Sequence, residues 1–149
     1  MPSALIRALS QRHGLPVVDA ETVDPFLAGS PGEPAAALVL FAGDPVRWPE
    51  ANDAAVILPE LLEAFAGALR GAVVARTAEE ALKSRFGVVV FPSIAVVSDG
   101  RTLATIAKVR DWADYRARIR AALAGDGEPA KPGAGPRTDI RFVGARSDA

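Results

Sequence analysis

Cysteine and histidine, two residue types that commonly act as nucleophile, general base or metal ligand, are nearly absent from this sequence. It contains no cysteine and a single histidine, His13. Without cysteine there can be no disulfide exchange, no thiol nucleophile and no thiolate-bound metal. A lone histidine also argues against a Ser-His-Asp triad and against a histidine-bound zinc or haem. We therefore expect no catalytic residue, no metal and no cofactor in this chain.

Acidic side chains gather instead around one proline-rich loop, residues 43–54. The loop contains Asp44, Glu50 and Asp53, and it carries Trp48 among charged residues and prolines. An aromatic side chain in a polar loop is a common anchor at protein interfaces. Two plainer interpretations stay open: the carboxylates are ordinary solvated surface, and Trp48 folds back to cover the core.

Charge is distributed unevenly along the chain, although the net charge is only −1. Residues 1–69 carry three arginines against nine acidic residues, a net charge of −6, which leaves +5 for the remainder. The overall basic footprint of a nucleic-acid-binding domain is therefore absent. An acidic half suits a basic partner, although a solvated acidic face is the more common case.

One domain must position these side chains, because 149 residues, half of them apolar, suit a single hydrophobic core. No apolar run approaches the roughly 20 residues that a membrane span needs. The first 15 residues also lack the apolar core and cleavage site of a secretory signal. These observations predict a cytoplasmic protein.

Apolar periodicity and turn residues predict an alternation of helices and strands. In chain order we expect a helix over 3–13, a strand over 15–20, a helix over 22–29, a strand over 35–43, a helix over 56–71, a strand over 72–76, a helix over 77–87, a hairpin over 88–109 and a helix over 111–125. The hairpin should turn at Asp99-Gly100. This order predicts an α/β fold with a central mixed sheet and helices on both faces.

Three predicted helices carry more detailed expectations. Pro59 should start or kink the helix over 56–71. Thr77 and Glu80 should form a capping box at the start of the helix over 77–87. The apolar face of the first of these helices comprises Leu58, Leu61, Leu62, Phe65 and Leu69. The residues of the last helix expected to face the core are Trp112, Tyr115, Ile119 and Leu123.

Beyond the last predicted helix the composition changes. Residues 125–138 are rich in glycine and proline, which is typical of a flexible tail. We therefore expect one domain over 1–124 and a tail over 125–149. A weak strand signal lies at Ile140 to Val143, which we expect to be disordered alone or to dock on a partner.

Three stretches of the sequence together resemble the thioredoxin family, over roughly residues 15–124. The strand "ALVLFAG" leads to the proline-containing helix "VILPELLEAF", and "FGVVVFPSIAVVSDGR" supplies a hairpin with a proline near its start. The resemblance implies that Pro92 is the cis-proline of that fold, preceded by Phe91. In thioredoxins this proline faces the redox site, and its loop presents backbone to an extended peptide.

The chain departs from thioredoxins at the redox site itself. A thioredoxin has its two cysteines eight and five residues before the helix proline, and counting back from Pro59 gives Ala51 and Ala54. Neither side chain can form a thiolate, so the disulfide chemistry of the family is absent. Function must therefore be judged from the residues that are present.

A narrower resemblance accounts for a thioredoxin-like domain without cysteine. The stretch "LVLFAGDPVRWPEANDAAVILPELLEAF" and the hairpin sequence resemble hydrogenase expression/formation proteins of the HyaE/HupG/HoxO type. The shared "DP-x-R-x-PE" loop here consists of Asp44, Pro45, Arg47, Pro49 and Glu50. The resemblance implies a chaperone in maturation of nickel–iron uptake hydrogenases. Its partner would be the small-subunit precursor or the twin-arginine signal peptide of that subunit, and other maturation proteins are further candidate partners.

If a twin-arginine peptide is the partner, the site needs carboxylates for guanidinium groups and an apolar groove. We expect it to comprise Asp44, Trp48, Glu50, Asp53, Phe91 and Pro92. The alternatives are a redox-inactive scaffold with the thioredoxin fold and an enzyme of other chemistry, such as a glutathione-type transferase. Such an enzyme would have only the hydroxyls of Ser93 and Ser98 near the proline, with no histidine as base.

Overall fold

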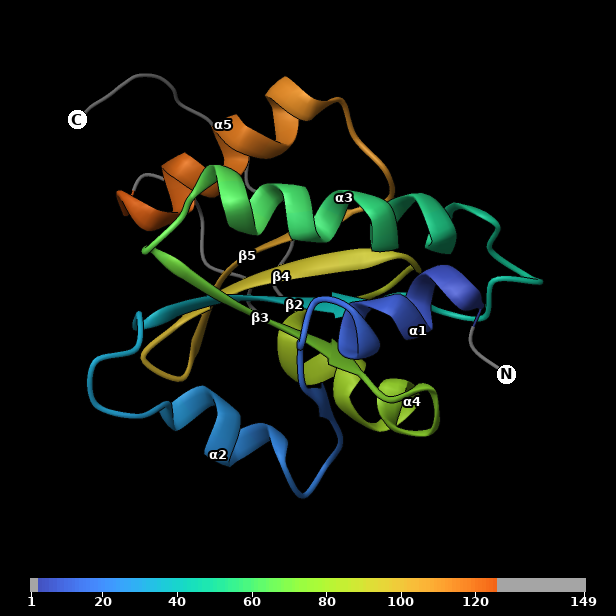
Figure 1. Ribbon diagram of the computed structural model, residues 1–149, viewed down its shortest axis with the longest axis horizontal. Helices are drawn as coiled ribbons and strands as arrows, with labels where there is room; N and C mark the ends of the chain where they lie inside the picture. Colours follow the sequence, from blue (N-terminus) through green and yellow to red (C-terminus); the bar gives the residue numbers. More distant parts are fainter. Residues whose placement is uncertain (1–2, 126–149) are drawn as a thin grey trace.

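A five-stranded mixed sheet forms the centre of the computed structural model, which describes residues 3–125 (Figure 1). The spatial order of its strands is β1-β3-β2-β4-β5. Their bounds are Val17–Val18 for β1, Ala36–Phe41 for β2, Leu69–Val74 for β3, Ser93–Ser98 for β4 and Arg101–Ala107 for β5. The first three strands run parallel, while β4 pairs antiparallel with both β2 and β5. The predicted α/β fold with a mixed sheet is confirmed.

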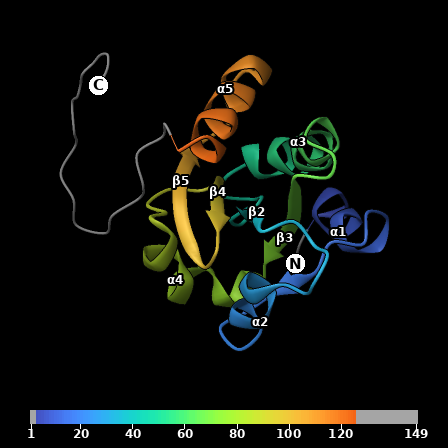
Figure 2. The ribbon, with the colours of Figure 1, turned by 90° about the vertical axis from the view of Figure 1, so that its left-hand side faces the viewer.

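Helices cover both faces of this sheet (Figures 1 and 2). One face carries α1 (Ala4–Gln11), α3 (Glu50–Ala64) and α5 (Trp112–Leu123), and the other carries α2 (Val23–Ala28) and α4 (Glu79–Leu82). Every residue of the central strand β2 is buried, because its alternate side chains enter the two cores. That burial explains the uninterrupted apolar sequence of β2.

The hairpin turns where the sequence predicts. Asp99 and Gly100 have φ angles of 54° and 77°, the pair of positive values that a type I′ turn requires. Strand β4 begins only at Ser93, so the predicted strand start at residue 88 is wrong. Pro92 therefore lies before the hydrogen-bonded ladder, which it could not have joined as a donor. The Phe91-Pro92 peptide bond is cis, as the resemblance implies.

Helix α3 begins at Glu50, six residues earlier than predicted, and ends at Ala64. Residues 50–54 are therefore helical, and their acidic side chains suit the positive end of a helix dipole. The helix continues through Pro59, which neither starts nor ends it. Leu69, predicted on the face of this helix, instead begins β3, because the chain reverses at Gly67 with φ 84°.

Two further details differ from the predictions. Residues 76–86 form a short helix, α4, between two 3-10 turns, and no side-chain cap bond is made at Thr77 or by Glu80. Trp112 is 41% exposed rather than buried. The buried stripe of α5 begins one turn later at Tyr115, whose hydroxyl donates a hydrogen bond to the Lys108 carbonyl at 3.0 Å. Of the predicted tail only Gly125 is described, so Ile140–Val143 lies outside the described residues.

Candidate functional site

The predicted site residues lie at one end of the sheet, which we call the loop end. Here β2 ends at Phe41, β4 begins at Ser93 and β5 ends at Ala107. The connection between β2 and α3, residues 42–49, crosses this end, at the right of Figure 1. The carboxyl ends of parallel strands are the usual position of binding sites in α/β folds. The opposite end, marked by the Asp99-Gly100 turn, is the turn end.

Trp48 and Phe91 form the apolar centre of the loop end. Their ring centroids are 5.2 Å apart, and the planes meet at 68° in an edge-to-face arrangement. Phe91 and Pro92 are buried, whereas Trp48 is half-buried. The guanidinium of Arg47 lies 4.4 Å from the Trp48 ring centroid. The structure thus brings the predicted site residues Trp48, Phe91 and Pro92 together. Trp48 is the accessible one, and Phe91 packs against it.

Gly43 allows this close packing. Its φ is +81°, and a Cβ at this position would lie 2.6 Å from the Phe91 Cβ and 3.2 Å from Cε3 of Trp48. Only glycine adopts this positive φ readily and also lets the rings of Phe91 and Trp48 pack so close to the backbone. The backbone N–H of Gly43 is also used, because it donates a hydrogen bond to Oε2 of Glu79 at 2.9 Å.

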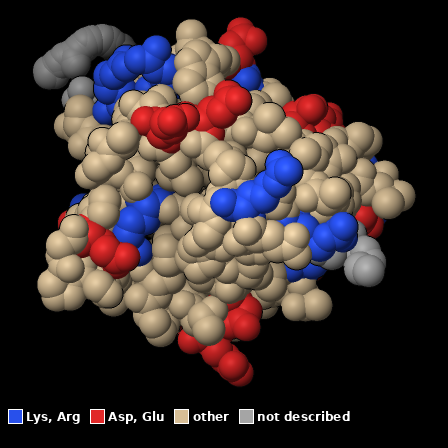
Figure 3. All heavy atoms as spheres, in the orientation of Figure 1, with Lys and Arg blue, Asp and Glu red and all other residues tan. Residues whose placement is uncertain are grey.

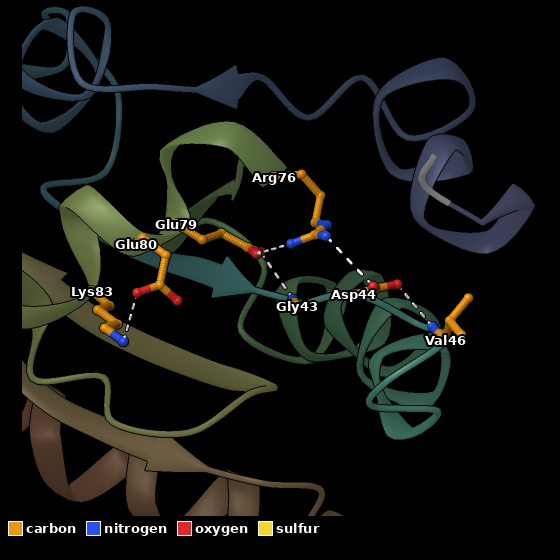
Figure 4. Close-up of polar contacts among 7 residues, drawn as sticks. All are labelled: Gly43, Asp44, Val46, Arg76, Glu79, Glu80 and Lys83. Atoms are coloured by element: carbon orange, nitrogen blue, oxygen red, sulfur yellow. Dashed lines mark hydrogen bonds and ion pairs between the residues drawn. The ribbon is translucent and has the colours of Figure 1, made fainter.

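A chain of charged groups runs beneath the loop, from Glu79 through Arg76 to Asp44 (Figure 4). Arg76 approaches Oε1 of Glu79 with Nη1 and Oδ2 of Asp44 with Nη2, both at 3.6 Å. These distances are ion-pair contacts but are too long for hydrogen bonds. The other oxygen of Asp44 accepts a hydrogen bond from the Val46 N–H at 3.0 Å. Asp44 is therefore tied into the loop rather than extended into solvent.

Glu79 is the unusual member of this group, because a charged side chain is rarely buried so completely. It is 2% exposed, and its Oε1 has no hydrogen-bond partner among the described residues. Burial raises the pKa of Glu79, while the Gly43 N–H and the charge of Arg76 act in the opposite direction. The net direction is upward, so Glu79 holds its proton more readily than an exposed glutamate.

A cavity of about 120 Å³ lies beside Glu79, between α1, the end of β3 and the start of the loop. Its walls are mainly apolar, from residues such as Ile6, Val17 and Val73. Its polar lining includes Arg7, Ser10, Arg76 and Glu79. The cavity therefore combines an apolar wall with a buried carboxylate.

The remaining predicted site residues, Glu50 and Asp53, project from the first turn of α3. Both are exposed, and Glu60 and Glu63 follow on the same helix. Figure 3 shows acidic side chains gathered over α3 on the face of the molecule that it presents. Ala51 and Ala54, which the resemblance aligns with the thioredoxin cysteines, are buried in the core.

Sequence reasoning missed Gly43, Arg76 and Glu79. One signal for Glu79 was present, because it stands three and seven residues before Leu82 and Phe86, both of which are buried. Such spacing places a carboxylate on the apolar face of a helical segment. The sequence offers no local sign that the N–H of Gly43, 36 residues earlier, is the partner.

Residues 3–125 contain no group of three or more His, Cys, Asp or Glu side chains that could hold a metal ion. No helix in the same range is both long and apolar enough to cross a membrane.

Comparison with known proteins identifies strong similarity over nearly the whole chain. Residues 5–115 match the family model of Hydrogenase-1 expression protein HyaE. The hydrogenase expression/formation protein HupG of Rhizobium leguminosarum bv. viciae is 48% identical over 144 residues, which cover 97% of each chain. HoxO of Azotobacter vinelandii, also a hydrogenase expression/formation protein, is 41% identical, over 83% of this chain and 80% of that protein.

A solved structure agrees with these relatives. A protein of Rhodopseudomonas palustris CGA009, described as hydrogenase expression/formation protein hupG, is 53% identical in its crystal structure. The match covers 73% of this chain and 95% of that chain, with a TM-score of 0.52. The chain belongs to the HyaE family of hydrogenase expression/formation proteins.

Proposed function

We propose that this protein is a non-catalytic cytoplasmic chaperone in the maturation of a nickel–iron uptake hydrogenase. Its client is the precursor of the small subunit, which it binds through the twin-arginine signal peptide. Family membership supports a role in hydrogenase expression or formation. The choice of client follows from the sequence resemblance and from the chemistry of the loop end.

The observation that carries this proposal is an apolar surface at the loop end, bordered by carboxylates. Val46 is 87% exposed and Val89 is 81% exposed, two residues before Trp48 and Phe91 respectively. Large apolar side chains so fully exposed, each two residues from one ring of the Trp48–Phe91 contact, are typical of an interaction site. The apolar segment of a signal peptide would cover them.

The neighbouring carboxylates suit the basic part of such a peptide. Glu50 and Asp53 are exposed at the start of α3, directly after the loop that carries Trp48. A guanidinium group forms paired hydrogen bonds with a carboxylate, and these are stronger than neutral hydrogen bonds. A peptide with adjacent arginines and an apolar stretch therefore matches both parts of the surface.

The alternative of an enzyme with glutathione-type chemistry has less support. The hydroxyl of Ser93, next to Pro92, is buried and donates a hydrogen bond to the Val90 carbonyl at 2.8 Å. A hydroxyl held in this way is not presented to a substrate, and its hydrogen-bond partner is a carbonyl rather than a base. The geometry favours binding over nucleophilic catalysis.

Calorimetric titration with the signal peptide of the hydrogenase small subunit tests the proposal. We expect micromolar binding, weakened when both arginines of the peptide are changed to glutamine. Trp48→Ala and the pair Glu50→Gln and Asp53→Asn should each weaken binding about tenfold or more.

Asp99→Asn is the matched control, because it removes a carboxylate at the turn end of the sheet and should leave binding unchanged. If neither peptide binds, or if Asp99→Asn weakens binding as much as the pair Glu50→Gln and Asp53→Asn, the signal-peptide proposal is wrong.

A further inference from the structure

The buried carboxylate of Glu79 has an unmet hydrogen-bonding capacity. Oε2 accepts the Gly43 N–H, whereas Oε1 has no hydrogen-bond partner among residues 3–125 although it is buried. A buried polar atom without a partner costs on the order of 1–3 kcal/mol. Glu79 is also one of the residues that line the cavity of about 120 Å³ beside α1. The buried carboxylate therefore belongs to a residue on the cavity wall.

Arg76 indicates which chemical group this place accepts. Its guanidinium reaches towards two carboxylates that come from different connections, Asp44 after β2 and Glu79 after β3 (Figure 4). It contacts each at 3.6 Å, outside hydrogen-bond range, and it remains 47% exposed. The two carboxylates are therefore spaced to share one guanidinium, but Arg76 satisfies neither of them fully.

We propose that the two carboxylates and the cavity form a binding site for the guanidinium group of one arginine side chain of the client. Arg76 holds this place in the free protein and moves aside when the client binds. This inference rests on the proposed function, because it assumes a client with accessible arginines. Glu79 and Asp44 would bind one arginine of the client beside the cavity, whereas the exposed Glu50 and Asp53 would bind the client at the surface of α3.

Charge favours the exchange. Within residues 3–125, Arg76 is the cation that pairs with both Asp44 and Glu79. When Arg76 turns towards solvent, the site loses one positive charge beside its two carboxylates. An incoming guanidinium restores that charge and also holds Glu79 in its ionised form.

Size and wall chemistry are also suitable. A cavity of about 150 Å³ can hold benzene, so 120 Å³ has room for the planar head of one arginine. The apolar walls from α1, β1 and β3 would contact the methylene groups of the side chain. Oε1 of Glu79 is buried in the free protein, so the guanidinium contacts it only once Arg76 has moved aside.

The test uses acetyl-arginine-amide as the probe and follows the backbone amides of Gly43 and Glu79 by NMR titration. Acetyl-citrulline-amide, which has the same shape without the charge, is the ligand control. We expect shifts at both amides with the arginine probe and at least about tenfold weaker binding of citrulline. Glu79→Gln should abolish the arginine response, while Asp99→Asn should not change it.

Replacement of Arg76 gives the decisive result. The affinity for the arginine probe should rise if Arg76 only occupies the site in the free protein, and it should not rise if Arg76 is a structural part of the site. If Arg76 is a place-holder, Arg76→Ala and Arg76→Gln should bind the probe about tenfold more tightly than the unmodified protein. Equal or weaker binding by both variants, with thermal unfolding showing that they are folded, would overturn the inference.

The outcome also separates this inference from the proposed function. If the probe binds as expected but the signal peptide does not, the arginine site stands and the client is another arginine-bearing protein. If the signal peptide binds without shifts at Gly43 and Glu79, the proposed function stands and the arginine site is wrong.

Discussion

Strand β3 has an arginine near each end, and the two are held in very different ways. At the turn end, Arg70 donates hydrogen bonds to the carbonyls of Pro34 at 2.8 Å and Phe26 at 2.7 Å, and it lies 4.6 Å from the Phe26 ring centroid. At the loop end, Arg76 reaches its two carboxylates only at 3.6 Å. Arg70 therefore stabilises the fold through two hydrogen bonds, whereas Arg76 makes no hydrogen bond to Asp44 or Glu79.

The cavities at the two ends differ in the same way. The turn-end cavity is larger, about 530 Å³, but Glu33 on its wall accepts the Ser30 N–H at 2.8 Å and Asp24 pairs with Arg85. The loop-end cavity is about 120 Å³, and it is lined by Glu79, which has the one buried side-chain oxygen in residues 3–125 that lacks a hydrogen-bond partner. Unmet hydrogen bonding is therefore a better guide to a site here than volume.

The largest expected effect comes from glycine replacement at the two ends. Gly43→Ala should destabilise the protein by about 3 kcal/mol, because it adds a collision with Phe91 to the cost of a positive φ. Gly32→Ala, where φ is +88° and no atom lies within 4 Å of the added Cβ, should cost only about 1 kcal/mol. Urea unfolding measures both, and equal losses would show that the packing of Gly43 against Phe91 is unimportant.

A smaller effect should separate the two arginines. Arg70→Ala should lower the free energy of unfolding by about 2 kcal/mol, since it removes two charged hydrogen bonds to carbonyls. Arg76→Ala should cost less than about 1 kcal/mol, because the ion pair is long and half exposed and Glu79 can take up a proton instead. Thermal and urea unfolding compare them. A larger loss for Arg76→Ala would contradict the distinction drawn between the two ends.

The smallest effect is a pH dependence carried by Glu79. The pKa of Glu79 in the folded protein lies above the ordinary value of 4.5. At pH values between 4.5 and this raised pKa, the folded state therefore binds more protons than the unfolded state. The contribution of Glu79 to stability is therefore fully present below 4.5 and is lost as pH rises through the raised pKa. Glu79→Gln removes this loss, so the stability of the variant relative to the unmodified protein should increase between pH 4.5 and 7. A constant difference across that range would show that Glu79 titrates normally.

Much of the fold was predictable because it follows from local patterns. The apolar run at β2 and the Asp99-Gly100 turn each specify their structure within a few residues. The start of α3 was misjudged because Pro49 and the charged residues around it are typical of a loop. The helical spacing of the buried residues Ala51, Ala54 and Leu58 was nevertheless present in the sequence.

The site was predictable only in part, for a physical reason. Trp48, Phe91 and Pro92 were placed together through resemblance to a known fold, and the structure brings them together. The contact between Glu79 and Gly43 joins two connections that follow different strands. Periodicity shows which face of a segment is apolar, but it does not show which distant N–H will meet a carboxylate there. Such a partner becomes visible only in the packed structure.

The two alanines near the start of α3 have a consequence for how the acidic end of that helix is held. Ala51 and Ala54 are 0% and 1% exposed, and both belong to the core between the sheet and the helices α1, α3 and α5. A larger side chain at either position would have to displace neighbours or shift the helix, because protein interiors are close-packed. The turn that presents Glu50 and Asp53 to solvent is therefore anchored through its two smallest apolar side chains.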